Sequence, residues 1–257
     1  MCYETDARPP LPPISGGASA QGSALTLEAK DGNRFSAFES RAVQASNKGV
    51  VILPDVRGLH AFYEDLALRF GDTGVNAVAI DYFGRTAGLG TRDDSFEFMP
   101  HVMQTQPDTV SLDTAAAVAH LRDEIGCTDV FTMGFCFGGR SSFNQAGRGH
   151  GLAGVIGFYG RVAAASEEDA NAPIDLVETY DCKVLGLFGG ADPSIPVETI
   201  DAFRKAMEAK GLPNEIQVYE GAPHSFFDRS FTQFKEQCDD AWHRILGFIG
   251  ASGAGGA

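Results

Sequence analysis

Short apolar runs recur along the chain and alternate with segments whose apolar residues have helical spacing. Continuous runs such as residues 49–53 (GVVIL) are typical of strands that are buried on both faces of a parallel sheet. A hairpin is expected around Asp31-Gly32, which lies between two further strand-like segments. The strands predicted in this way are residues 24–28, 34–39, 49–53, 75–80, 129–133, 155–159, 183–188 and 215–219.

Helices are predicted between most of these strands. Apolar spacing indicates helices at residues 63–70, 111–125 and 198–210, and a final amphipathic helix within residues 231–248. Strands that alternate with helices predict an α/β fold, in which a doubly wound, mostly parallel sheet is flanked by helices.

No break in composition divides the chain, so residues 23–250 are expected to form a single domain. Residues 1–22 are rich in Pro, Gly and Ser and predict an extended or disordered N-terminal arm, and residues 251–257 predict a flexible tail. The long connection at residues 81–106 is expected to be functional, as long loops in compact domains usually are. Residues 160–180 are expected to form a cap-like loop with a short helix.

The formal net charge of −14 argues against nucleic acid and anionic membrane surfaces as partners. No apolar stretch reaches the ~18 residues that a membrane span needs, and the N-terminus lacks the apolar segment of a secretory signal. The five cysteines show no zinc-ligand spacing, so no metal and no cofactor is expected. Their odd number fits a reducing, cytoplasmic location.

Residues 134–139 (GFCFGG) follow a predicted strand and precede a run that can form a helix. This is the sequence form of a nucleophile elbow, in which flanking glycines permit a tight turn around the nucleophile. The central residue is Cys136, and the chain contains no Gly-x-Ser-x-Gly. A small, packed cysteine in a strand-to-helix turn is the alternative, so the rest of the chain must decide its role.

Two polar residues follow later strands, Asp192 after residues 183–188 and His224 after residues 215–219. Functional residues of open α/β sheets gather beyond the carboxyl ends of the strands. The order Cys136, Asp192, His224 also matches the nucleophile, acid, histidine order of α/β-hydrolases. The open alternatives are Asp181 and Asp228 for the orienting acid and His60 and His101 for the base.

Three motifs together resemble those of the dienelactone hydrolase family. They are GFCFGG at residues 134–139, Gly-Gly-Ala-Asp ending at Asp192, and Ala-Pro-His-Ser-Phe around His224. The similarity extends over roughly residues 24–249. It implies an α/β-hydrolase fold with a catalytic triad, in which Cys136 is the nucleophile, Asp192 the orienting acid and His224 the base.

The resemblance implies further roles around this triad. The backbone N–H groups of Phe137 and Val56 would form the oxyanion hole, and Arg85 would grip a substrate carboxylate with its planar fork. Asp55 stands where the family's prototype has a glutamate that holds the resting thiol. The prototype's second carboxylate-binding arginine is replaced by an acid here, so Arg229, the next residue, is its candidate substitute.

These residues predict a hydrolase that cleaves a lactone or small carboxylic ester through a thioester acyl-enzyme. Its partner would be a small-molecule ester or lactone, carboxylate-bearing if Arg85 binds as implied, and the chain would act as a monomer or homodimer. A carboxylesterase or thioesterase of the same fold is the first alternative. A non-catalytic binder or thiol redox sensor would use Cys136 as a reactive thiol but would leave Asp192 and His224 unexplained.

Overall fold

The computed structural model describes residues 8–12 and 20–251. Residues 1–7, 13–19 and 252–257, which belong to the predicted arm and tail, lie outside the described residues. One sheet has the strand order β1-β2-β4-β3-β5-β6-β7-β8. The strands are β1 (Gly22–Glu28), β2 (Arg34–Ser40), β3 (Lys48–Leu53), β4 (Asn76–Ile80), β5 (Asp129–Phe135), β6 (Gly154–Phe158), β7 (Lys183–Gly189) and β8 (Asn214–Tyr219).

The sheet is mixed, as the sequence predicts. β2 pairs antiparallel with β1 and β4, whereas the strands from β4 to β8 all run parallel to their neighbours. All eight predicted strands are present, and the carboxyl ends of β3, β5, β6, β7 and β8 therefore lie along one edge of the sheet. The prediction of a doubly wound, mostly parallel sheet is confirmed.

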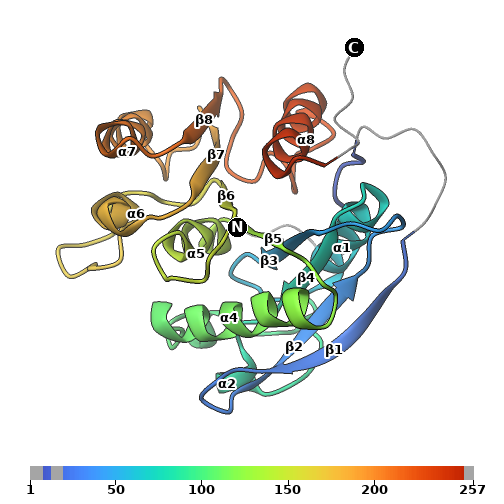
Figure 1. Cartoon of the computed structure of the whole chain (residues 1–257). Helices are drawn as coiled ribbons and strands as arrows, with labels where there is room; N and C mark the ends of the chain where they lie inside the picture. The colour runs from blue at the N-terminus through green and yellow to red at the C-terminus, as the bar shows by residue number, and fades with distance from the viewer. Residues whose placement is uncertain (1–7, 13–19, 252–257) are drawn as a thin grey trace.

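Helices cover both faces of the sheet (Figure 1), with α1 and α8 on one face and α4, α5 and α7 on the other. The long helices α7 and α8 end at Gly211 and Gly250, which adopt the left-handed conformation that favours glycine. The helices are α1 (Ala61–Asp72), α2 (Gly84–Ala87), α3 (Met99–Val102), α4 (Pro107–Asp123), α5 (Phe137–Gln145), α6 (Pro173–Leu176), α7 (Val197–Lys210) and α8 (Lys235–Ile249), with a 3-10 turn, η1 (Val177–Thr179).

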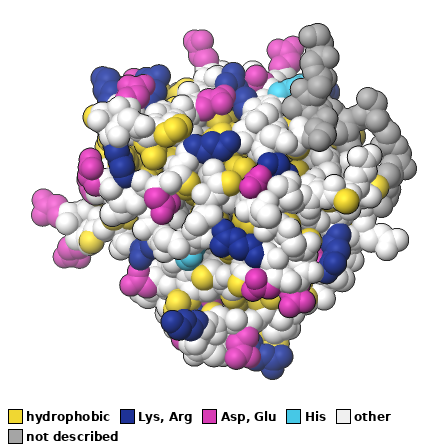
Figure 2. All heavy atoms as spheres, in the orientation of Figure 1, with side chains coloured by type: hydrophobic (Ala, Val, Ile, Leu, Met, Phe, Trp, Pro, Cys, Tyr) yellow, Lys and Arg dark blue, Asp and Glu magenta, His cyan; other side chains and the backbone are white. Residues whose placement is uncertain are grey.

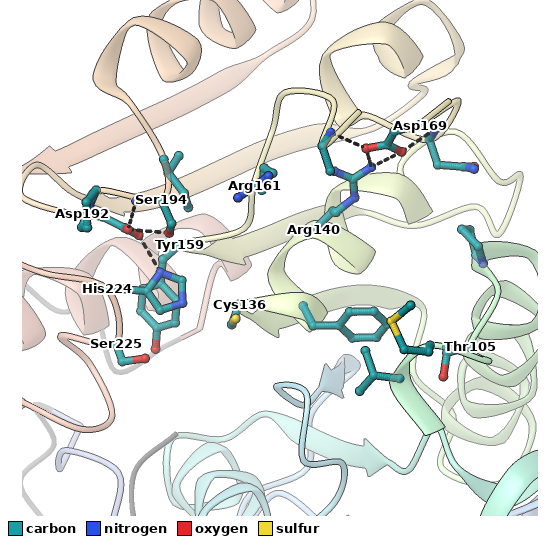
Figure 3. A pocket seen from close by; sticks show the side chains of 18 of the residues that line it. Thr105, Cys136, Arg140, Tyr159, Arg161, Asp169, Asp192, Ser194, His224 and Ser225 are labelled. Carbon is teal, nitrogen blue, oxygen red and sulfur yellow. Dashed lines mark hydrogen bonds and ion pairs between the residues drawn. The ribbon is translucent and has the colours of Figure 1, made fainter. Parts of the chain in front are cut away.

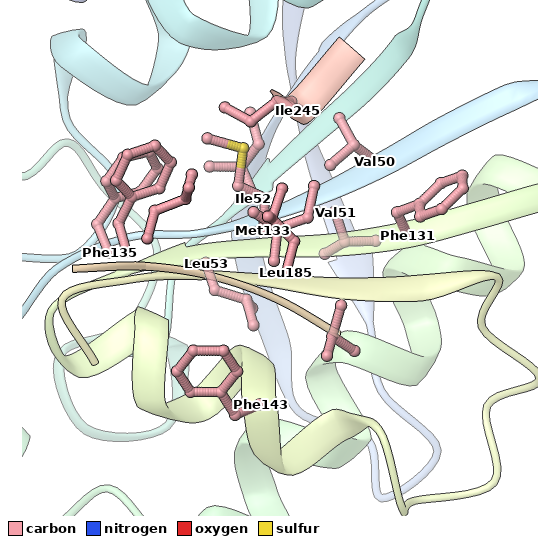
Figure 4. Close-up of a cluster of buried hydrophobic side chains, with 14 of the residues drawn as sticks. Val50, Val51, Ile52, Leu53, Phe131, Met133, Phe135, Phe143, Leu185 and Ile245 are labelled. Carbon is pink, nitrogen blue, oxygen red and sulfur yellow. The ribbon is translucent and has the colours of Figure 1, made fainter. Parts of the chain in front are cut away.

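The core lies where the central strands meet the helices of both faces (Figure 4). Val50, Val51 and Ile52 of β3 are fully buried although successive side chains point to opposite faces. Ile245 from α8 and Phe143 from α5 pack on the two sides. Each such side chain contributes roughly 1.5–3 kcal/mol by burial, so this core holds the strand ends in fixed positions.

Charged side chains of both signs are interspersed on the face shown in Figure 2, so the acidic excess is not gathered there into one patch. Within residues 8–12 and 20–251, no helix combines the length and apolar character that crossing a membrane requires. The same part of the chain contains no group of three or more His, Cys, Asp or Glu side chains that could hold a metal ion.

Candidate active site

Cys136 lies on the turn between β5 and α5, because β5 ends at Phe135 and α5 begins at Phe137. Its backbone has φ 54° and ψ −111°, a region that non-glycine residues rarely adopt. A Cβ atom on Gly134 would lie 1.9 Å from the carbonyl oxygen of Gly138. The turn therefore requires glycine on its strand side and projects the Cys136 side chain beyond the sheet edge.

Asp192 and His224 reach the same edge from neighbouring strands. Asp192 follows β7 and His224 follows β8, and these two strands are parallel partners. The Nδ1 atom of His224 lies 2.5 Å from Oδ2 of Asp192 (Figure 3). The other carboxylate oxygen accepts hydrogen bonds from the Ser194 N–H at 2.8 Å and the Ser194 hydroxyl at 2.6 Å. Asp192 is thus held from both sides.

The charge state of His224 follows from these contacts. Burial lowers the pKa of His224, but the hydrogen bond with Asp192 and the nearby Cys136 side chain outweigh it and raise the pKa to about 10. Burial likewise raises the pKa of Asp192, while the hydrogen bonds from His224 and Ser194 bring it below its ordinary value. Near neutral pH the His224 imidazole is therefore protonated, and it is hydrogen-bonded to the Asp192 carboxylate.

Tyr159, directly after β6, supports His224 from a third direction. Its ring centroid lies 4.8 Å from that of His224, and its backbone has a positive φ of 36°. The Tyr159 hydroxyl donates to the buried carboxylate of Asp228, and burial raises the pKa of Asp228 to about 6. Asp228 therefore bonds to Tyr159, whereas Asp192 is the acid that contacts His224.

The residues expected around an oxyanion lie near the elbow. The backbone of Phe137 opens α5, where the first N–H groups of a helix lack partners within it. A Cβ on Gly138 would lie 2.1 Å from the carbonyl oxygen of Leu53, so the end of β3 abuts the first turn of α5. Val56 follows three residues after Leu53 and is half-buried.

Arg85 does not face the site, contrary to the expectation from the resemblance. Its guanidinium pairs with Asp31 in the β1–β2 turn and, at 2.7 Å, with the buried Asp113 of α4. Asp55 is buried as well, and its carboxylate pairs with Arg57 at 3.2 Å. Neither Arg85 nor Asp55 is among the described residues that line the cavity at Cys136, whereas Arg229 is.

A cavity of about 990 Å³ is lined by Cys136, Asp192 and His224 together. Two arginines that sequence reasoning did not single out, Arg140 on α5 and Arg161 after β6, also line it. Arg161 could have been found by the rule that selected Asp192 and His224, because it follows a predicted strand closely. Arg140 lies inside a helix, and no pattern in the sequence distinguishes it from a surface arginine.

Comparison with known proteins identifies the family of this chain. The model of the family described as "Dienelactone hydrolase family" matches residues 35–252. A Methylorubrum extorquens protein provisionally named carboxymethylenebutenolidase is 28% identical over 201 residues, which cover 76% of this chain and 69% of that protein. A Bradyrhizobium protein provisionally named 2-oxo-3-(5-oxofuran-2-ylidene)propanoate lactonase is 25% identical over 206 residues, which cover 78% and 82%.

Among solved structures, one from Klebsiella pneumoniae that is provisionally described as a dienelactone hydrolase superposes with a TM-score of 0.78. The two chains are 23% identical, and the match covers 91% of this chain and 99% of that one. The likeness shows the fold, which is the α/β-hydrolase fold.

Proposed function

Because the chain belongs to the dienelactone hydrolase family and is therefore a hydrolase of lactones or esters, we propose that it works through Cys136, Asp192 and His224. The observation that carries the proposal is the position of the His224 imidazole, which is hydrogen-bonded to the Asp192 carboxylate and lines the same cavity as Cys136. A nucleophile, a base and an orienting acid in contact form the arrangement that acyl transfer requires.

In the first step Cys136, whose thiol proton has passed to His224, attacks the carbonyl carbon through its sulfur, and the negative charge moves to the carbonyl oxygen. We place that oxygen at the N–H of Phe137 and the N–H of Val56, donors of a kind commonly worth about 3 kcal/mol each in the transition state. The tetrahedral species collapses, His224 gives its proton to the leaving alkoxide, and a thioester with Cys136 remains. From a lactone, the alcohol stays attached to the acyl group.

Hydrolysis of the thioester completes the cycle. His224, now neutral, accepts a proton from water, and the hydroxide so formed attacks the thioester carbonyl. The carbon–sulfur bond breaks and a carboxylic acid is released. The Cys136–His224 pair returns to its starting state. Asp192 holds the imidazole in one orientation and stabilises its charged form throughout.

This chemistry suits activated acyl groups. A thiolate is a good leaving group, so the first tetrahedral species expels it unless the departing alkoxide is also stable. Lactones that open to enolates and aryl esters meet this condition, and the Bradyrhizobium relative is named for such a lactone. We also place the enzyme in the reducing cytoplasm, because Cys136 must remain a thiol; all four described cysteines are free.

The proposal is tested by measuring the hydrolysis of short-chain 4-nitrophenyl esters by Cys136→Ala and His224→Ala. Each variant should lose about 10³-fold or more in kcat, as is usual when one member of a triad is removed. Mass spectrometry of rapidly quenched enzyme should find the acyl group on the peptide that contains Cys136.

Cys182→Ala is the matched control, because Cys182 is buried away from the cavity and burial raises its pKa to about 12. It should keep the wild-type rate. Near-wild-type hydrolysis by Cys136→Ala, or an acyl group on another residue, would refute the assignment of the nucleophile.

A further inference from the structure

The cavity above Cys136 offers two different chemical surfaces. Val102, Met103 and Phe137 form an apolar side, and Met103 is 76% exposed at its rim. The volume of about 990 Å³ lies at the upper end of the roughly 300–1,000 Å³ that small-molecule sites occupy. A single lactone ring would leave most of this space empty, so the site has room for a longer substrate.

Three arginines also line the cavity, and they are not equivalent. Arg140 is committed to Asp169 by two hydrogen bonds of 2.7 and 2.8 Å (Figure 3). Arg229 lines the cavity but already has an interaction partner within the protein. Arg161 is exposed, and no hydrogen bond or ion pair engages its side chain within residues 8–12 and 20–251.

The segment after Arg161 is held in place over the cavity. Asp169 accepts the backbone N–H of Ala165 at 2.8 Å and that of Asn171 at 3.2 Å, in addition to its bonds with Arg140. Arg140 also donates to the carbonyl oxygen of Ala163 at 3.3 Å. Helix α5 thus fixes the loop that carries Arg161, although the Arg161 side chain itself is unconstrained.

The other end of this segment is fixed by the site itself. Arg161 lies two residues after Tyr159, whose buried ring contacts His224. Arg161 and Cys136 line the same cavity, so one substrate that spans this cavity could contact both. Neither position at which the family resemblance implied anion binding supplies an available arginine. Arg85 pairs with Asp31 and Asp113, and the second position is occupied by Asp228.

We propose that Arg161 is the anion-recognising residue of this site, and that the enzyme selects elongated esters with an apolar chain and a terminal carboxylate. This inference rests on the proposed function. The apolar chain would lie along Val102 and Met103, and the carboxylate would face Arg161. The chain as a whole carries a net charge of −14, which does not favour an anionic substrate. Arg161 supplies a local positive charge at the cavity, and this charge would attract the substrate carboxylate.

The test compares two esters of equal chain length, the mono-4-nitrophenyl ester of suberic acid and 4-nitrophenyl octanoate. Arg161→Gln should lower kcat/KM about tenfold for the suberate ester, the effect of one partly exposed charge-assisted hydrogen bond. It should leave kcat/KM for the octanoate ester unchanged. Arg161→Lys should keep most of the preference for the suberate ester over the octanoate ester. Equal losses on both esters, or no loss on either, would overturn the inference.

Two further variants locate the effect. Arg204→Gln on α7 removes an exposed arginine that pairs with Asp201 outside the cavity, and it should change neither rate. Arg229→Gln should affect the suberate ester less than Arg161→Gln does. If Arg229→Gln alone abolished the preference, Arg161 would not be the recognition residue.

Binding of amide analogues separates this inference from the proposed function. Calorimetric titration of Cys136→Ala with suberanilic acid and with octananilide needs no turnover. Suberanilic acid should bind more tightly, and adding Arg161→Gln should remove that difference. Equal affinities in Cys136→Ala would refute anion recognition even if the esters are hydrolysed. A clear difference would support it even if the nucleophile were assigned wrongly.

Discussion

Cys136 owes its position to a backbone conformation that costs free energy. A non-glycine residue at φ 54° is strained by roughly 1–3 kcal/mol, and the surrounding structure has to offset this. The N–H of Cys136 donates to the carbonyl oxygen of Phe158 at 3.0 Å, which ties the strained residue to β6. The thiol is consequently presented to His224 by a rigid turn rather than by a mobile loop.

The pH dependence of the reaction tests the pairing of the protonated His224 imidazole with the Asp192 carboxylate. The pKa of His224 is raised from 6.5 to about 10, so the imidazolium should persist through neutral pH and be lost only as pH rises through about 10. kcat/KM should therefore hold to alkaline pH and fall there. Asp192→Asn removes the largest interaction that raises this pKa, so the alkaline fall should move toward neutral pH.

The profile is measured with an aryl ester, after subtraction of the rate with Cys136→Ala to remove hydrolysis by hydroxide. If Asp192→Asn lowered kcat but kcat/KM still fell at the same alkaline pH, Asp192 would orient His224 without setting its charge. Tyr159→Phe keeps the ring against His224 and removes the hydroxyl that donates to Asp228. The alkaline fall should stay in place in this variant if Asp192, and not Asp228, sets the charge of His224.

At the scale of elements, the elbow depends on the end of β3 as much as on β5. Gly138 lies in the first turn of α5, and a Cβ there would meet the carbonyl oxygens of Leu53 at 2.1 Å and Pro54 at 2.2 Å. These are backbone atoms, so Gly138→Ala must push α5 away from β3. We expect the free energy of unfolding to fall by about 1–3 kcal/mol, measured by urea denaturation.

Gly247→Ala is the matched control, because Gly247 lies in α8 with no atom within 4 Å of an added Cβ. It should raise the free energy of unfolding by up to about 1 kcal/mol through helix propensity. Gly138→Ala should also lower esterase activity, since α5 carries the Phe137 N–H. A stable and fully active Gly138→Ala enzyme would contradict the close approach of β3 and α5.

The sheet and the shared location of Cys136, Asp192 and His224 could be predicted from the sequence because both depend on local patterns. Apolar runs mark the strands, and Asp192 and His224 follow strands whose ends must share one edge. The orientation of Arg85 could not be predicted, because it depends on Asp31 and Asp113, which are 54 and 28 residues away. The sequence around Asp31 predicts a hairpin turn, and no neighbouring residue indicates that Asp31 pairs with Arg85.

At the scale of the whole molecule, aromatic side chains connect the N-terminal segment to the elbow. The indole N–H of Trp242 on α8 donates to the carbonyl oxygen of Pro10 at 3.1 Å, and Pro10 is buried. The ring of Phe227 lies 5.8 Å from that of Trp242 and 4.6 Å from that of Phe158, measured between centroids. Residues 8–12 belong to the predicted arm, yet part of them packs against the domain.

Deleting residues 2–12 should therefore destabilise the protein. The deletion takes away the acceptor of the Trp242 N–H and exposes the indole in the middle of α8, and we expect the free energy of unfolding to fall by about 1–3 kcal/mol. Trp242 is the single tryptophan of the chain, so its fluorescence should shift to longer wavelength as water reaches the indole. Urea denaturation followed by this fluorescence measures both effects at once.

Arg8→Ala distinguishes packing from charge in the same experiment. Arg8 pairs with Asp65 at 2.5 Å, but the Arg8 side chain is 61% exposed, and such surface pairs contribute about 1 kcal/mol or less. Arg8→Ala should therefore leave the Trp242 emission unchanged and barely move the unfolding midpoint. If the deletion changed the unfolding midpoint and the Trp242 emission no more than Arg8→Ala does, the contact of Pro10 with Trp242 would add nothing to stability. Residues 8–12 would then not stabilise the domain.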